Sequence, residues 1–182
     1  MGSRVVIVGG DAAGMTAASD LVKEVGPDHE VVVIERGQHT SYSACGLPYW
    51  VAGDVTSSDH LIARTPAEHR ANGIDLRLGV TATGLDADRR VVVTTEGDLG
   101  YDYLLLATGA EPQRPDVPGA HAEGITAITT IPQGEELLRQ IERHPEKVVV
   151  AGSGFIGVEM AEVCARLGLD TTMVSSSPHP LD

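Results

Sequence analysis

The chain has 182 residues, with 13 Lys or Arg, 26 Asp or Glu, and a formal net charge of −13. Its hydrophobic content of 42% is typical of a globular protein and too high for a disordered one. The acidic balance argues against a nucleic-acid-binding protein, and two cysteines are too few for a secreted disulfide scaffold.

The beginning of the chain shows no targeting signal. The apolar run at residues 5–8 stops at Gly9, and no stretch approaches the ~20 apolar residues of a membrane span. We therefore expect a soluble, cytoplasmic protein with neither a membrane nor a nucleic acid as partner.

An internal repeat organises the chain. Residues 4–18 and residues 147–161 each contain a β-branched apolar run, a glycine-rich turn and an Ala-rich stretch typical of a helix. A second apolar run follows each copy, at residues 31–34 and 171–174. Short, uniformly apolar strands that alternate with helices indicate βαβ units and a buried parallel sheet, so the predicted class is α/β.

The region between the two copies predicts a different set of elements. Thr65 and Pro66 have the pattern of a helix N-terminus, and that helix should end near residues 72–73. Further strands are predicted at 74–78, 80–83, 91–95 and 103–107, the last of them buried, and a helix at 135–143. Residues 111–119 hold three prolines and are the best linker candidate. We therefore predict a first domain at 1–112, with a small antiparallel section, and the start of a second at 113–182.

The first glycine-rich turn has the context of a dinucleotide-binding site. Gly9, Gly10 and Gly14 lie between a strand and a helix, where backbone N–H groups can approach a pyrophosphate. Asp11 occupies the position of the second glycine in the usual G-x-G-x-x-G pattern. Glu35, at the end of the next strand, can accept hydrogen bonds from ribose hydroxyls. A plain strand–helix turn without ligand is the alternative.

The second turn matches the full pattern with Gly152, Gly154 and Gly157. Ser175 stands where the first copy has Glu35, so no carboxylate would repel a ribose 2′-phosphate. Two such units predict two dinucleotides, and the serine predicts that NADPH is accepted at least as well as NADH.

Cys45 is the candidate redox residue. It lies among small residues, and a helix that starts at or just after it would direct an N-terminal dipole at the sulfur and favour the thiolate. The alternative is a small buried hydrophobic residue. Cys164, by contrast, lies inside the Ala-rich stretch of the second copy and predicts core packing. The seven histidines show no metal-ligand spacing, so no metal site is expected.

Four segments resemble the pyridine nucleotide–disulfide oxidoreductases, a family of FAD flavoproteins. The segments are residues 5–15, the cysteine segment 41–50, residues 105–110 and residues 150–162. The resemblance is strongest to the single-cysteine branch of coenzyme A-disulfide reductases and NADH oxidases. It implies a Rossmann-like FAD-binding domain and the first part of a Rossmann-like NAD(P)H-binding domain.

The resemblance also implies roles for particular residues. FAD would contact Gly9, Gly10, Ala12, Ala13, Gly14, Glu35, Arg36, Thr108 and Gly109. NADPH or NADH would contact Gly152, Gly154, Phe155, Ile156, Gly157, Glu159 and Ser175. Cys45 would be the catalytic sulfur, and Thr16, Lys23 and Ser41 match substrate contacts.

Departures from the family pattern narrow the expected activity. Trp50 stands where dithiol members have a second cysteine, so Cys45 would cycle through a mixed disulfide or a sulfenic acid. Ala12 replaces the histidine of NADH peroxidases, and Val22 and Lys23 replace two arginines that meet coenzyme A. The expected reaction is NAD(P)H-dependent reduction of a disulfide such as coenzyme A disulfide, or of a persulfide. The alternatives are an NADH oxidase that uses a sulfenate, or a non-catalytic dinucleotide-binding fragment.

Family members run to several hundred residues. The resemblance therefore predicts that this chain corresponds to the N-terminal part of such a protein, as a fragment, a truncated gene product or half of a split protein. The parent protein would form a homodimer through its C-terminal domain.

Overall fold

The computed structural model describes residues 2–26 and 28–181. The chain forms two compact units: Met1–Tyr42 with Ile62–Ala110, and Ser43–Leu61 with Glu111–Asp182. The sequence had placed residues 43–61 in the first domain, whereas these residues belong to the second compact unit. The domain limits 1–112 and 113–182 stay a prediction.

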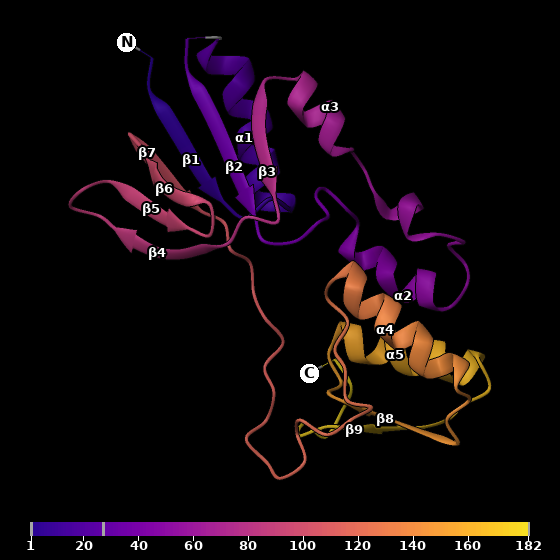
Figure 1. Cartoon of the computed structure of the whole chain (residues 1–182). Coiled ribbons are helices and arrows are strands. Elements are labelled where there is room, and N and C mark those ends of the chain that lie inside the picture. Colours follow the sequence, from indigo (N-terminus) through magenta and orange to yellow (C-terminus); the bar gives the residue numbers. More distant parts are fainter. Residues whose placement is uncertain (1, 27, 182) are drawn as a thin grey trace. The chain divides into compact units, whose positions relative to one another are not determined.

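The first unit is built on a parallel sheet of four strands. Its order is β3 (Ile74–Leu78), β2 (Glu30–Glu35), β1 (Arg4–Val8) and β7 (Tyr103–Leu106). Both neighbours of β1 pair with it in parallel (Figure 1). This arrangement confirms the α/β class predicted from the sequence.

Both faces of this sheet are covered, which explains its uniformly apolar strands. Helix α1 (Ala12–Val25) covers one face through Met15 and Ala18, which pack on alternate residues of the strands. A three-stranded antiparallel sheet covers the other face through Val92 and Leu99. This sheet consists of β4 (Ala82–Asp86), β5 (Val91–Thr94) and β6 (Gly97–Gly100).

Three features of the first unit differ from the sequence prediction. β4 begins at Ala82 instead of residue 80, and β6 was not predicted because its residues Gly-Asp-Leu-Gly carry little strand signal. β7 was expected to be buried, yet Tyr103 and Leu106 are exposed because β7 is an edge strand in the described part of the chain. Helix α3 (Pro66–Ala71) begins at Thr65 with a capping box, as the sequence predicts.

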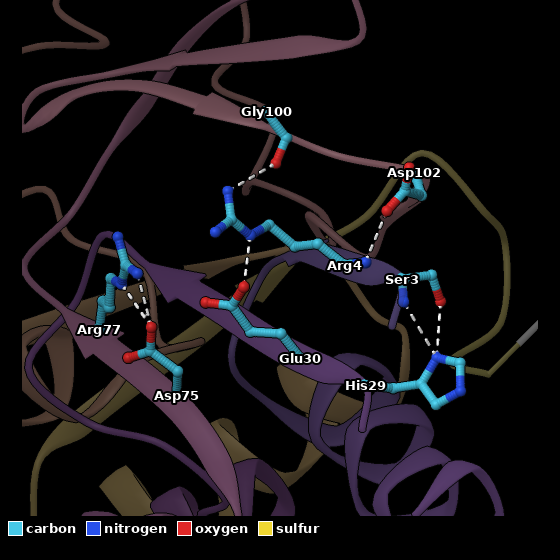
Figure 2. A network of polar contacts seen from close by, with 8 residues as sticks. All are labelled: Ser3, Arg4, His29, Glu30, Asp75, Arg77, Gly100 and Asp102. Atoms are coloured by element: carbon cyan, nitrogen blue, oxygen red, sulfur yellow. Dashed lines mark hydrogen bonds and ion pairs between the residues drawn. The ribbon is translucent and has the colours of Figure 1, made fainter. Parts of the chain in front are cut away.

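Arg4 makes several polar contacts at the end of the sheet where β1 begins, as Figure 2 shows. Its Nε donates to Glu30 Oε2 (2.6 Å) and its backbone N–H donates to Asp102 Oδ2 (2.7 Å). A third bond reaches the Gly100 carbonyl at 3.4 Å. These contacts tie β1 to β2 and to the residues before β7, so this end of the sheet has a structural role.

In its described residues, the second unit contains a two-stranded parallel sheet and three α-helices. The strands are β8 (Lys147–Ala151) and β9 (Asp170–Val174), and α5 (Phe155–Arg166) connects them. Helix α5 packs on both strands, and α2 (Leu47–Val51) packs against α4 (Ile131–Glu142) and α5 (Figure 1). Thr130 starts α4 earlier than the predicted residue 135, because its side chain accepts a hydrogen bond from Gln133 N–H. In the described residues, the outer faces of both strands are exposed.

The segment that carries Cys45 is anchored inside this unit by two contacts. Trp50 of α2 packs against Gly134 of α4 so closely that a Cβ at residue 134 would lie 2.7 Å from Trp50 Cζ3. Arg166, at the end of α5, donates to both carboxylate oxygens of Asp54 at 3.0 and 2.8 Å. Short 3-10 turns at Ala44–Gly46 and Ser58–Leu61 flank the α2 region.

No helix in the described residues combines the length and the apolar character needed to cross a bilayer.

The Gly134–Trp50 contact yields a prediction that a spectrum can check. Gly134→Ala should displace the indole and destabilise the chain by about 1–3 kcal/mol, because the new methyl has no room. Trp50 is the single tryptophan of the chain and is only 9% exposed, so its emission should shift to the red. Exposed Glu135→Ala on the same helix is the control. An unchanged emission maximum in the Gly134 variant would contradict this packing.

Candidate functional site

The first glycine turn requires glycine at two points of close backbone approach. Gly9 has a φ of +111°, and a Cβ there would lie 2.1 Å from the Ala107 carbonyl oxygen. A Cβ on Gly14 would lie 1.9 Å from the Gly9 carbonyl oxygen. The start of α1 therefore rests directly on the end of β1, which directs free N–H groups of the helix toward the turn.

The carboxylate of Glu35 is fixed by backbone groups on both sides. Gly10 N–H donates to one of its oxygens (2.8 Å) and Gly37 N–H donates to the other (2.6 Å). Because an ionised carboxylate only accepts hydrogen bonds, it can receive further bonds from ribose hydroxyls but not from a phosphate. The contact of Glu35 with a ribose stays a prediction.

Asp11 introduces a second carboxylate at this turn. It is the N-cap residue of α1, and its Oδ1 is buried without a hydrogen-bond partner in the described residues. Burial, with the charge of Glu35 as a lesser cause, raises the pKa of Asp11. Burial and the same two acidic residues raise the pKa of Tyr42 to about 12. The turn is therefore crowded with acidic groups.

The loop after β2 is held to the turn and to α3. The Thr40 hydroxyl, which is buried, donates to the Gly10 carbonyl at 2.5 Å. Ser41 has a φ of +49°, and its Oγ lies 2.8 Å from His69 Nε2. His69 is buried, its Nδ1 has no partner in the described residues, and burial lowers its pKa. Ser41 is therefore oriented by a histidine 28 residues away, a pairing that no sequence spacing indicated.

The second turn repeats the backbone geometry of the first. Gly152 has a φ of +114°, and a Cβ on Gly157 would lie 2.2 Å from the Gly152 carbonyl oxygen. Around Gly154, however, the space that a Cβ would occupy is open within 4 Å. Phe155 and Ile156 are 78% and 52% exposed, so the turn presents apolar side chains and an open glycine to solvent.

Three serines form a hydrogen-bonded group at the end of β9. Ser153 Oγ lies 2.6 Å from Ser175 Oγ, and Ser177 N–H donates to Ser175 Oγ at 3.0 Å. Ser153 is buried, whereas Ser175 is exposed. Ser175 thus occupies the position equivalent to Glu35, as predicted, but Ser153 was missed because it fills a variable position of the glycine pattern.

Cys45 and Cys164 lie in opposite environments. Cys45 is exposed and lies in the middle of the 3-10 turn Ala44–Gly46, and helix α2 begins two residues later, at Leu47. A Cβ on the adjacent Gly46 would lie 2.6 Å from Leu61 Cδ2, so a larger residue there would require the Leu61 side chain to move. Cys164 is buried, and burial raises its pKa. The exposed sulfur is the one available for chemistry.

The remaining predicted contact residues of the first unit are spread over its surface. Lys23 pairs with Asp20 (3.2 Å), and Thr16 lies two turns earlier on α1. The other exposed ones are Ala12, Ala13, Arg36, Thr108 and Gly109. In the second unit, Glu159 of α5 is half-buried.

Each unit therefore has a strand, a glycine turn, a helix and a second strand parallel to the first. A polar side chain is fixed at the end of the second strand. This combination defines a protein with two dinucleotide-binding βαβ units. The chain belongs to the pyridine nucleotide-disulphide oxidoreductase family, whose sequence profile matches residues 3–182 and whose members are FAD-dependent enzymes.

Two curated relatives and one solved structure cover nearly the whole chain. An NADH oxidase of Methanocaldococcus jannaschii is 36% identical over 185 residues, covering 98% of this chain and 41% of the relative. A Pyrococcus horikoshii NAD(P)H coenzyme A polysulfide/persulfide reductase is 37% identical, covering 96% and 40%. The solved structure of an NAD-dependent persulfide reductase from A. fulgidus matches with a TM-score of 0.92 and 35% identity, covering 98% of this chain and 34% of that one. The chain thus spans about two fifths of the length of these curated relatives.

The crowded acidic turn predicts a pH-dependent stability. The pKa of Asp11 is raised above 3.8 in the folded state, so in this pH range the folded chain binds more protons than the unfolded chain. The free energy of unfolding therefore falls as the pH rises from 3.8 through the raised pKa. Asp11→Asn should therefore raise the Tm at pH 7, by roughly 2–4 °C, and the gain should shrink toward pH 4. Thermal unfolding at several pH values checks this, with exposed Asp20→Asn on the same helix as control. A gain that is equal at both pH values would show that charge is not its cause.

Proposed function

We propose that this chain supplies the FAD-binding turn, the NAD(P)H-binding turn and the redox cysteine of an enzyme that reduces a disulfide or persulfide. The observation that carries the proposal is the contrast between the two sulfurs. Cys45 is exposed and belongs to the same compact unit as the second glycine turn, while Cys164 is buried. Two of the similar proteins are named persulfide reductases, which supports this class of acceptor.

The residues of the first turn fit the ADP portion of FAD. Gly9, Gly10 and Gly14 bring the backbone close together, and the Glu35 carboxylate is held in position to accept ribose hydroxyls. The further proposed contacts are Ala12, Ala13, Arg36, Thr108 and Gly109. The carboxylates of Asp11 and Glu35 both oppose an anionic group at this turn, so the proposed pyrophosphate contacts are the backbone N–H groups at the start of α1.

The residues of the second turn fit a nicotinamide dinucleotide. The open space at Gly154 admits a pyrophosphate, and Gly152 and Gly157 shape the turn. Phe155, Ile156, Glu159 and Ser175 complete the proposed contacts. Because Ser175 carries no charge, we propose that NADPH is accepted at least as well as NADH.

When bound, the two cofactors supply the pair of electrons that the reduction requires. The Cys45 thiolate attacks one sulfur of the substrate disulfide, forming a Cys45–substrate mixed disulfide and releasing the other half as a thiolate. Two electrons and a proton then cleave the mixed disulfide, which releases the second half as a thiol and restores the Cys45 thiolate. Thr16, Lys23 and Ser41 are proposed substrate contacts, with Lys23 as the positive charge for an anionic group.

An NADH oxidase is the second candidate, because the Methanocaldococcus jannaschii relative has that name. In that case the Cys45 thiolate would attack a peroxide, forming a sulfenic acid and releasing hydroxide. Two electrons and two protons would then reduce the sulfenic acid to a thiol and water. The two candidates use the same sulfur and differ in the acceptor.

The experiment that tests the proposal labels the cysteines of the native chain. Coenzyme A disulfide at a small excess should add one coenzyme A to Cys45, because this sulfur is exposed, and leave Cys164 unmodified. Peptide mass spectrometry locates the adduct, and dilute peroxide in parallel tests sulfenate formation. Cys45→Ser should abolish both modifications, whereas Cys164→Ser should leave them unchanged. Preferential modification of Cys164 would overturn the proposal.

Substitutions at two glycines of the second turn test folding and nucleotide binding separately. Gly157→Ala should lower the Tm, because its methyl would collide with the Gly152 carbonyl oxygen at 2.2 Å. Gly154→Ala should change the Tm much less, since the space is open, yet it should weaken NADPH and NADH binding at least about tenfold by blocking the pyrophosphate. Calorimetric titration and thermal unfolding measure the two effects. Undiminished nucleotide affinity in Gly154→Ala would place the nucleotide elsewhere.

A further inference from the structure

The two repeats of this chain use the same hydrogen-bonding scheme with different side chains. In the first, Gly9 N–H donates to the Ile34 carbonyl (2.9 Å), and Gly37 N–H donates to Glu35 (2.6 Å). In the second, Gly152 N–H donates to the Val174 carbonyl (2.8 Å), and Ser177 N–H donates to Ser175 (3.0 Å). Ser175 and Glu35 are therefore equivalent positions, each held by the backbone two residues further on.

The remaining partner differs between the repeats. In the first, Gly10 donates its backbone N–H to Glu35 Oε2. In the second, the equivalent residue is Ser153, and its side-chain Oγ contacts Ser175 Oγ at 2.6 Å. A hydroxyl, unlike a backbone N–H, can either donate or accept, so the direction of this bond decides what Ser175 offers to a ligand.

Burial sets the direction of the bond. Ser153 is 8% exposed, and Ser175 Oγ is the partner of its hydroxyl in the described part of the chain. If Ser175 donated, the Ser153 proton would be left buried without an acceptor, which is costly. If Ser153 donates, its proton is satisfied, and the Ser175 proton faces solvent. The Ser153-to-Ser175 direction is therefore favoured.

In this arrangement Ser175 Oγ accepts two hydrogen bonds, from the Ser153 hydroxyl and from Ser177 N–H. Both of its lone pairs are then used, and only its proton remains for a ligand. Glu35 offers only acceptors at the equivalent position, whereas Ser175 offers only a donor. A donor suits a phosphate oxygen, while an acceptor suits a ribose hydroxyl.

We propose that Ser153 is a positioning residue that makes Ser175 a donor for a phosphate ester on the ribose 2′ oxygen. Ser153 itself does not touch the ligand; it acts by donating to Ser175. This inference rests on the proposed binding of a nicotinamide dinucleotide at the second turn. It attributes the preference of that turn for a 2′-phosphate over a free 2′-hydroxyl to the direction of the hydrogen bond between Ser153 and Ser175.

The test uses two probes that differ only at the 2′ position, adenosine 2′,5′-bisphosphate and 5′-AMP. Calorimetric titration of the 182-residue chain should show that Ser153→Ala weakens the bisphosphate about three- to tenfold and leaves 5′-AMP within about twofold. Without Ser153, Ser175 has a free lone pair and no longer presents a fixed donor. The ratio of the two affinities is a readout that general destabilisation would not move.

A double-mutant cycle separates positioning from direct contact. Ser175→Ala should cause at least the loss seen for Ser153→Ala, and the double variant should lose no more than Ser175→Ala, because the effect of Ser153 passes through Ser175. Ser175→Glu should reverse the preference by recreating the chemistry of Glu35. Ser176→Ala, which removes a neighbouring exposed hydroxyl, is the matched control.

The outcomes distinguish this inference from the proposed function. If the wild-type chain binds neither probe, the proposed nucleotide site fails, and the inference fails with it. If both probes bind and Ser153→Ala leaves their affinity ratio unchanged, the site stands but the positioning role is overturned. A loss in Ser153→Ala that adds to the loss in Ser175→Ala also overturns it, since Ser153 would then act independently.

Discussion

The close contact between a strand end and the first turn of the following helix is the constraint on which this structure depends. At Gly14 and Gly157 a single added Cβ would approach a carbonyl oxygen to about 2 Å, well inside van der Waals distance. Only glycine allows that approach, and it brings the N-terminus of each helix to the carboxyl end of the sheet. This one packing requirement therefore places the free N–H groups of each helix beside the polar side chains at the carboxyl ends of the strands.

The same backbone arrangement carries different chemistry in its two copies. In the first, a carboxylate fixed by two N–H groups faces a turn that already contains Asp11. In the second, the equivalent side chain is a neutral hydroxyl. The fold supplies the place for a nucleotide, and one side chain at the end of the second strand sets which hydrogen bonds the place offers.

The segment around Cys45 shows how an irregular stretch is held without regular structure of its own. Its helix α2 has five residues, too few to be stable alone. The indole of Trp50 against Gly134 and the two-point contact between Arg166 and Asp54 fix it to α4 and α5. Residues far apart in the sequence therefore position the exposed sulfur.

Local sequence was sufficient for the features that depend on local chemistry. The apolar runs identified β1, β2, β8 and β9, because a strand covered on both faces or built into a βαβ unit has a distinct composition. The glycine spacing and the Thr65 cap identified the starts of helices, because turns and caps also depend on residues close together in the sequence. The position of Glu35 and its counterpart Ser175 also followed from the repeat. The sequence thus determined the class of fold and the general location of both glycine turns.

Tertiary structure decided the features that depend on residues distant in the chain. Exposure of Tyr103 in β7 depends on which strands pair beside it, and the grouping of residues 43–61 with the second unit depends on contacts with Gly134 and Arg166. The Ser41–His69 and Ser153–Ser175 pairs join residues 28 and 22 positions apart. Hydrogen bonds of this kind have no periodicity that a sequence can display, because the partners meet only after the strands and helices have packed.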